Sequence, residues 1–354
     1  MSSSEPITLV IPQSMGGSRL DQALQKLLPD YSRSRLQTWI KEQRVSVDDQ
    51  PATSKQKVWG GERVLLNPEP SPEVTAFHPE AMDLPVVYED EHLLVIDKPA
   101  GMVVHPAAGN WQGTLLNGLL HHAPQLKDLP RAGIVHRLDK DTSGLLVVAK
   151  TVAAQTSLVR QLQARTVKRE YRAIVWGQVW QNGTIETQIG RHPQSRTKMA
   201  VLRVGGKPAI THYEVLERFA VHTYLRVRLE TGRTHQIRVH MQHLGAPMVG
   251  DPVYGMRGIV PHQAITPTLK TALQQFKRQA LHAARLGLIH PASDEAMEWQ
   301  AELPEDMKAL LEAMRFEEPA VEEDFAIDYD DAFADDEFES DFDQEFDQDF
   351  EDET

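Results

Sequence analysis

The alternation of apolar and polar residues divides the chain into a small helical unit and a larger unit rich in strands. Between residues 20 and 28, apolar residues recur at the three- and four-residue spacing of an amphipathic helix. Ser32 is a favourable N-cap for a second helix, which continues to about residue 40. Short apolar runs at 44–50 and 58–66 then predict strands.

Beyond a proline-rich stretch, the pattern changes to short apolar runs, several of which alternate in period two. Such runs predict strands, and they outnumber the stretches with helical period. Strands are predicted within residues 86–99, 145–149, 166–177, 211–215 and 224–229, and helices at 115–120, 153–163 and up to Gly245. This mixture predicts an α+β fold. The expected division is a lead at residues 1–16, a small domain at 17–75, a linker at 76–83, a large domain at 84–315 and a tail at 316–354.

The charge of the chain is distributed unevenly. Residues 316–354 contain 20 Asp and Glu, no Lys or Arg, and 7 of the 10 Phe residues. This charge density opposes collapse into a core, so we predict a disordered acidic tail that contains Phe and whose partner is unknown. Without these 20 residues, 31 acidic residues face 37 Lys and Arg, a net charge of +6 that suits a polyanionic partner.

Composition also excludes several classes of protein. The chain has no cysteine, so disulfides and thiolate metal sites are excluded. There is no signal-peptide pattern, and no apolar run approaches the roughly 20 residues that span a bilayer. We expect a cytoplasmic monomer without membrane contact. No metal site is expected at His235, His240 and His243, which lack the H-E-x-x-H spacing, and neither nucleotide-binding glycine motif is present.

Charged side chains are concentrated in a loop at residues 136–144, between two apolar runs. The loop carries the carboxylates Asp139 and Asp141 among cations and hydroxyls. A charged loop on a rigid scaffold is a common way to build an active site. The alternative is a solvated loop whose Asp and Thr side chains cap a turn. On these residues alone, the carboxylate pair also allows acid/base hydrolysis of an N-glycoside.

Several motifs carry a resemblance to a known family. His136-Arg137-Leu138-Asp139, followed by Ser143-Gly144 and an apolar strand, resembles the signature of the RluA-type pseudouridine synthases. Residues 97–106, 168–177, 231–240 and 250–255 resemble further motifs of that family, with Asp97 where the family usually has Asn. The two-helix unit resembles an S4 RNA-binding domain. The resemblance implies a large domain with a central, mostly antiparallel mixed sheet.

The resemblance also implies a reaction, the isomerisation of a uridine extruded from RNA. Asp139 would be the nucleophile, whether it attacks the sugar at C1′, attacks the base or assists formation of a glycal, and Arg238 would be the cation that keeps it ionised. Tyr171 would stack on the base and could accept the C5 proton, although a strand tyrosine is more simply a core residue. Arg137 would fill the gap left by the flipped base, although it could instead contact phosphate. An isomerisation needs no redox or energy input, so no cofactor is expected.

Further residues are expected to bind RNA. His136, Arg233 and Thr142 lie in motifs close to the expected substrate, although a motif histidine is more often a hydrogen-bonded structural residue. In the S4-like unit, a helix N-terminus with cations beside it predicts a phosphate site. Its residues are Ser32, Arg33, Arg35, Lys41 and Arg44. The alternative is an ordinary solvated helix face.

The resemblance implies a substrate in the large ribosomal subunit. The expected target is the helix 69 stem-loop of 23S ribosomal RNA, either free or in a large-subunit particle. Two alternatives remain at this point. One is a catalytically silent RNA-binding or ribosome-assembly factor, which would keep the S4-like unit without needing Asp139, Tyr171 and Arg238 together. The other is a pseudouridine synthase that acts on another RNA.

Overall fold

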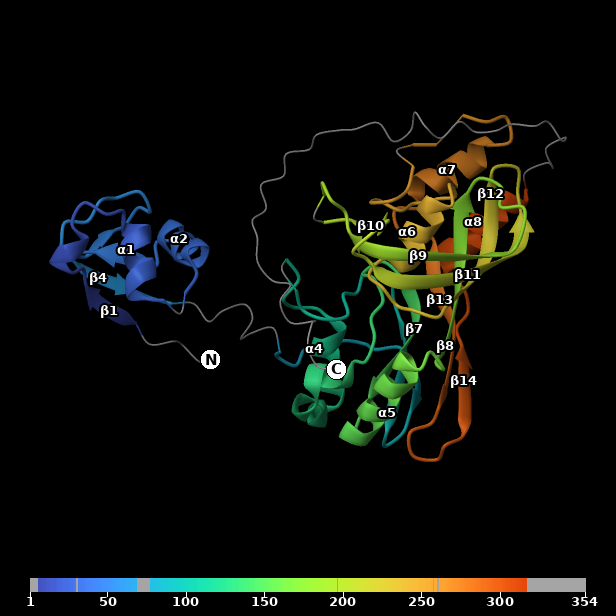
Figure 1. The fold of residues 1–354 in the computed structure, drawn as a ribbon, viewed down its shortest axis with the longest axis horizontal. Helices are drawn as coiled ribbons and strands as arrows, with labels where there is room; N and C mark the ends of the chain where they lie inside the picture. The colour runs from blue at the N-terminus through green and yellow to red at the C-terminus, as the bar shows by residue number, and fades with distance from the viewer. Residues whose placement is uncertain are drawn as a thin grey trace. The chain divides into compact units, whose positions relative to one another are not determined.

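The computed structural model describes residues 6–316, apart from residues 30, 69–76, 108, 196, 257 and 260 (Figure 1). The chain divides into two compact units, Met1–Ala76 and Phe77–Thr354. The predicted tail beyond Phe316 lies outside the described residues, as does Ala76 of the predicted linker. No helix in the described part of the chain is long and apolar enough to cross a membrane.

The N-terminal unit packs two helices, α1 (Leu20–Leu27) and α2 (Arg33–Lys41), with a small antiparallel sheet. The sheet has the strand order β1-β4-β2-β3. Its strands are β1 (Ile7–Val10), β2 (Val45–Val47), β3 (Gln50–Pro51) and β4 (Arg63–Leu66), and the short 3-10 helix η1 (Gln13–Met15) follows β1. As predicted, Ser32 caps α2: its hydroxyl accepts a hydrogen bond from the backbone N–H of Arg35 at 3.3 Å.

The predicted strand at 58–66 is wrong in its first half. Strand β4 begins only at Arg63. Gly60 and Gly61 both have a φ of 100°, a left-handed conformation that glycine adopts readily. The backbone N–H groups of Trp59 and Gly60 donate to the Glu62 carboxylate, the latter at 2.7 Å. These contacts make a turn where the apolar pattern suggested a continuous strand.

The larger unit is built on one mixed sheet that runs through its centre (Figure 1). Within the described residues its order is β10-β9-β11-β12-β8-β13-β7-β6-β5, and β14 also pairs with β13. The pairing of β13 with β7 is parallel, and the other named pairs are antiparallel. The strands are β5 (Val86–Glu89), β6 (Leu93–Lys98), β7 (Ser143–Ala149), β8 (Lys168–Trp176), β9 (Gly183–Arg191), β10 (Met199–Leu202), β11 (Lys207–Arg218), β12 (His222–Leu229), β13 (Leu281–Ile289) and β14 (Ala296–Gln300). The predicted α+β class with a mostly antiparallel mixed sheet is confirmed.

Helices and apolar clusters cover the sheet. The helices are α4 (Leu115–His122), α5 (Val152–Gln163), α6 (Gln236–His243), α7 (Pro267–Gln275) and α8 (Glu305–Arg315), with the 3-10 helices η2 (Pro124–Asp128) and η3 (Pro130–Gly133). Alternate residues of β8 point to opposite faces. Tyr171 and Ala173 belong to the core cluster that contains α4 and α6 residues, whereas Ile174 and Trp176 pack with α7 and α8. Helices α7 and α8 were not among the predicted elements.

Candidate active site

The charged loop lies between η3 and β7, and its backbone is fixed from several sides. The Thr142 N–H donates to the Asp139 carbonyl at 3.1 Å and closes a turn. Behind the loop, the fully buried Lys98 ammonium donates to the carbonyl of Lys140 at 2.9 Å, and burial lowers the pKa of Lys98 to about 7. Gly144 has a φ of 111°, and a Cβ there would lie 2.3 Å from the Ala283 carbonyl oxygen. The loop therefore presents Asp139 from a rigid base.

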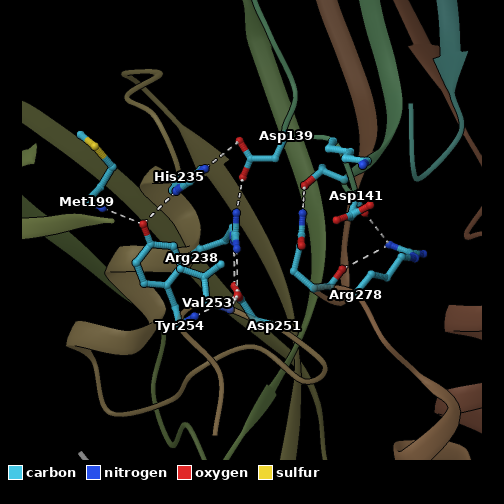
Figure 2. Close-up of polar contacts among 12 residues, drawn as sticks. Asp139, Asp141, Met199, His235, Arg238, Asp251, Val253, Tyr254 and Arg278 are labelled. Carbon is cyan, nitrogen blue, oxygen red and sulfur yellow. Dashed lines mark hydrogen bonds and ion pairs between the residues drawn. The ribbon is translucent and has the colours of Figure 1, made fainter. Parts of the chain in front are cut away.

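Asp139 is paired with Arg238, and Arg238 is itself held by a second carboxylate (Figure 2). The Arg238 Nη1 donates to Asp139 Oδ2 at 3.0 Å, while Nε and Nη2 donate to the two oxygens of Asp251 at 2.7 and 2.8 Å. The Arg238 side chain is 5% exposed, that of Asp251 is fully buried, and that of Asp139 is 16% exposed. The structure thus brings the predicted nucleophile and its predicted cation into contact.

Burial and ion pairing have opposite effects on the pKa values of Arg238 and Asp251. Burial alone would lower the pKa of Arg238, but its bonds to Asp251 and the charge of Asp139 outweigh burial and raise it. Burial likewise acts to raise the pKa of Asp251, but hydrogen bonds from Arg238 and from the backbone of Tyr254 and Val253 lower it. Both groups are therefore charged at neutral pH.

Tyr171 lies on β8 with its side chain in the cluster beside the loop. The residue is only 6% exposed. Burial raises the pKa of its phenol; the Arg169 charge opposes this, and the Asp139 charge adds to it. The phenol thus lies within electrostatic reach of Asp139. It is a core tyrosine whose pKa is affected by the charge of the predicted nucleophile.

The four residues predicted to bind substrate have different environments. His136 Nε2 accepts a hydrogen bond from the Val147 N–H at 3.2 Å, and burial lowers the pKa of His136 to about 3. Thr142 is 2% exposed and its hydroxyl accepts from Gln279 at 3.0 Å. Arg233 donates to the Pro208 carbonyl at 3.1 Å, whereas Arg137 is exposed. Their roles toward substrate stay predictions.

The cations predicted to bind RNA in the N-terminal unit have different surroundings. Arg33 donates to the fully buried carboxylate of Asp21 at 2.9 Å, so it stabilises the unit whatever else it contacts. Arg35 lies over the Trp39 ring at 5.0 Å, and Lys41 is exposed. Arg44 pairs with Glu42 at 3.4 Å. Arg35, Lys41 and Arg44 could therefore meet a phosphate without unpairing a buried acid, whereas Arg33 could not.

Sequence reasoning missed several residues that complete the site. Asp251 and Tyr254 both lie in the Gly250–Gly255 motif, which was noted without a role for any residue. His235 Nε2 lies 4.0 Å from Asp139 Oδ1. Arg278 forms a bidentate pair with Asp306 of α8 and donates to the Asp141 carbonyl at 3.2 Å. The available signal was Arg238 itself, because a buried arginine on a helix of apolar neighbours needs a carboxylate.

Two of the three histidines considered for a metal site, His235 and His240, form hydrogen bonds with hydroxyl groups. His240 lies 2.8 Å from the hydroxyls of both Thr187 and Thr211, and His235 lies 2.8 Å from the Tyr254 hydroxyl. Within the described residues, no three His, Asp or Glu side chains converge as metal ligands would.

Comparisons with known proteins point to one family. The family described as RNA pseudouridylate synthase matches residues 92–243, and the S4 domain matches residues 18–64. The ribosomal large subunit pseudouridine synthase D of Neisseria meningitidis serogroup B is 54% identical over 94% of this chain and 91% of its own length. The Escherichia coli K12 protein of the same name is 54% identical over 90% of this chain and 98% of its own length. The solved structure of human RNA pseudouridylate synthase domain containing 4 aligns with a TM-score of 0.52 at 25% identity, over 66% of this chain and 94% of that one.

Proposed function

The chain belongs to the RNA pseudouridine synthase family, and we propose that it converts uridine to pseudouridine in 23S ribosomal RNA, with the helix 69 stem-loop as target. We propose further that it acts as a monomer in the cytoplasm. The relatives named above, which act on the large ribosomal subunit by name, support the choice of RNA. The match to the S4 domain and the net positive charge of the chain outside its acidic tail also favour a polyanionic partner.

The observation that supports a nucleophilic Asp139 is that, among the residues the structure describes, its hydrogen-bonded ion pair with Arg238 engages one carboxylate oxygen only. In the reaction the bond from N1 of uracil to C1′ breaks, the base turns, and C5 joins C1′ with loss of the C5 proton. Arg238 Nη1 donates to Oδ2 of Asp139 at 3.0 Å, which places a positive charge beside the carboxylate and leaves Oδ1 as the attacking oxygen. A carboxylate is also a good leaving group, which suits an adduct that must reopen.

Tyr171 is suited to stack on the extruded base. Its buried ring lies on the same face of the sheet as α6, and the charge of Asp139 contributes to the raised pKa of its phenol. Because burial raises the pKa of the phenol, the resting hydroxyl is protonated at neutral pH. Stacking therefore follows more directly from its environment than acceptance of the C5 proton does.

Release of tritium from RNA labelled at uridine C5 tests the proposal, because pseudouridine formation frees that hydrogen. Wild-type protein is incubated with labelled 23S RNA, free or in large-subunit particles, beside Asp139→Asn, which keeps the shape of the side chain. We expect release by wild type alone, with RNA affinity of the variant within about threefold, a change of under 1 kcal/mol. Normal turnover by Asp139→Asn would exclude it as the nucleophile.

The target is tested with RNA in which the uridines of helix 69 are replaced by cytidine. We expect tritium release from 23S RNA to fall to background in this substrate. Undiminished release would place the modified uridines elsewhere, and no release from either substrate by wild type would contradict the proposed activity.

A further inference from the structure

His235 is a polar neighbour of the proposed nucleophile to which the reaction scheme gives no role. It is the N-cap of α6 and has a φ of 55°, a left-handed conformation that side-chain-bearing residues adopt rarely. Such backbone strain is found preferentially at functional sites. Its imidazole lies between Asp139 and Tyr254 (Figure 2). Its Nε2 is 4.0 Å from Asp139 Oδ1, and its Nδ1 is 2.8 Å from the Tyr254 hydroxyl oxygen.

One hydrogen bond of fixed direction favours one of the two neutral tautomers of the His235 imidazole. The backbone N–H of Met199 donates to the Tyr254 hydroxyl oxygen at 2.8 Å. The hydroxyl accepts there, so its own proton is available for His235 Nδ1. A neutral imidazole that accepts at Nδ1 carries its proton on Nε2. This N–H faces the carboxylate, whereas the other tautomer would turn a lone pair toward it.

The surroundings of the ring favour its neutral form. Burial lowers the pKa of His235, and this outweighs the opposing effect of the Asp139 charge. The positive charge of Arg238 acts in the same direction as burial. Arg238 therefore supplies the charge of the site, and His235 supplies a dipole.

The two donors address different oxygens of the same carboxylate. Arg238 takes Oδ2, and His235 faces Oδ1, the oxygen left to attack. The 4.0 Å separation is longer than a hydrogen bond, but contacts of this kind commonly tighten only when substrate binds. A neutral donor orients an oxygen without pairing its charge as strongly as a second cation would.

We propose that His235 is a positioning residue: its neutral Nε2–H orients Oδ1 of Asp139 for attack, and Tyr254, fixed by the Met199 backbone, sets the tautomer. This inference rests on the proposed function of Asp139.

The kinetic test compares His235→Gln with His235→Leu. Glutamine keeps an N–H donor at a similar reach, and leucine has a similar size without one. Both have the same positive φ to adopt, so any backbone strain is shared. We expect kcat for tritium release to fall roughly 10- to 100-fold in His235→Leu, as for a lost hydrogen bond to a charged group, and less than about 5-fold in His235→Gln, with KM nearly unchanged in both. Equal kcat in the two variants would overturn the proposal.

The tautomer is measured independently by NMR of protein labelled with ¹⁵N at histidine, the His235 signal being the one that disappears in His235→Gln. We expect the proton on Nε2 in wild type, and a loss of that preference in Tyr254→Phe together with a lower kcat and an unchanged KM. A wild-type ring protonated on Nδ1 alone, or on both nitrogens at neutral pH, would overturn the proposal. Absence of tritium release by wild type would refute the proposed function, while this spectrum would still decide the tautomer.

Discussion

Replacing Asp251 by Asn tests the central charge arrangement of the site most directly. Asp251 Oδ1 accepts from Arg238 Nη2 and from the N–H groups of Val253 and Tyr254 at 2.8, 2.8 and 2.9 Å. Its Oδ2 accepts from Arg238 Nε at 2.7 Å. An asparagine can keep its oxygen where three donors converge. Its amide NH₂ then faces Arg238 Nε–H, so two donors oppose each other and a buried arginine loses its full counter-charge.

The expected loss of stability follows from burial. Breaking a buried ion pair by removing one partner costs about 3–5 kcal/mol. At roughly 2–4 °C per kcal/mol in a unit of this size, the melting temperature should fall by about 6–20 °C. Asp306→Asn is the matched control, because Asp306 also binds an arginine through both oxygens, at 2.6 and 2.7 Å, but its side chain is 46% exposed. Its partner Arg278 is only 11% exposed, but the carboxylate that is replaced is half in solvent, so we expect a smaller loss than for Asp251→Asn.

The assay combines thermal unfolding at pH 7 with tritium release measured well below the melting temperature. In Asp251→Asn the guanidinium of Arg238 is no longer fixed, so kcat should fall at least about 10-fold, equivalent to 1.4 kcal/mol of transition-state stabilisation, with little change in KM. Equal losses of melting temperature in Asp251→Asn and Asp306→Asn would refute the argument from burial. A large stability loss with unchanged kcat would refute the argument that Arg238 must be held in place for catalysis.

Three further predictions concern other parts of the molecule. Burial acts to raise the pKa of Asp90, but hydrogen bonds, led by that from the Leu93 N–H, lower it to about 2. The ionised carboxylate should therefore stabilise the fold by about 2 kcal/mol above pH 4. This stabilisation should be lost as the pH falls from 3.8, the ordinary pKa of the group, toward 2. Urea unfolding from pH 7 to pH 3 should therefore show a gap between wild type and Asp90→Asn that narrows with acid; a constant gap would contradict it. Replacing Arg35 and Lys41 by Ala should reduce the slope of log RNA affinity against log salt concentration, by the amount expected for the loss of about two phosphate contacts. An unchanged slope would show that the two residues do not contact the RNA. Deleting residues 317–354 should change the melting temperature by less than about 2 °C relative to the full chain, which corresponds to under 1 kcal/mol. Because 20 acidic residues are removed, RNA affinity at low salt should rise. A large drop in melting temperature would show that the segment packs on the body.

The sequence located the residues that we propose to react, but not the residues that hold them in place. Asp139, Tyr171 and Arg238 lie in motifs, so the resemblance located them although they are far apart in the chain. Hydrophobic periodicity could not identify Asp251, because it lies in the loop after α6. The fold of this loop brings Asp251 back to Arg238 on the helix. The left-handed backbone of His235 likewise depends on tertiary contacts rather than on a sequence pattern.

Some misses had a signal in the sequence. Helix α8 buries Met307, Leu310, Leu311 and Met314, which is the three- and four-residue spacing of an amphipathic helix. The predicted strand at 58–66 failed for a different reason. Its apolar ends, which include the buried Val58 and Val64, favoured a continuous strand in spite of the two glycines between them. The Glu62 carboxylate instead stabilises a turn by accepting hydrogen bonds from backbone N–H groups, including that of Gly60.

The arrangement around Arg238 reconciles two opposing needs of the proposed nucleophile. Asp139 must stay ionised in a largely buried site, which requires a cation, yet a bidentate arginine would occupy both of its oxygens and oppose attack. Asp251 removes this conflict by binding Nε and Nη2 of Arg238, so that only Nη1 is left for Asp139. Three of the five N–H donors of the guanidinium are thereby used on the two carboxylates, and the ion pair with the proposed nucleophile involves one of its oxygens only. In the proposed mechanism, the buried carboxylate of Asp251 therefore acts on catalysis indirectly, by limiting how tightly Arg238 can hold Asp139.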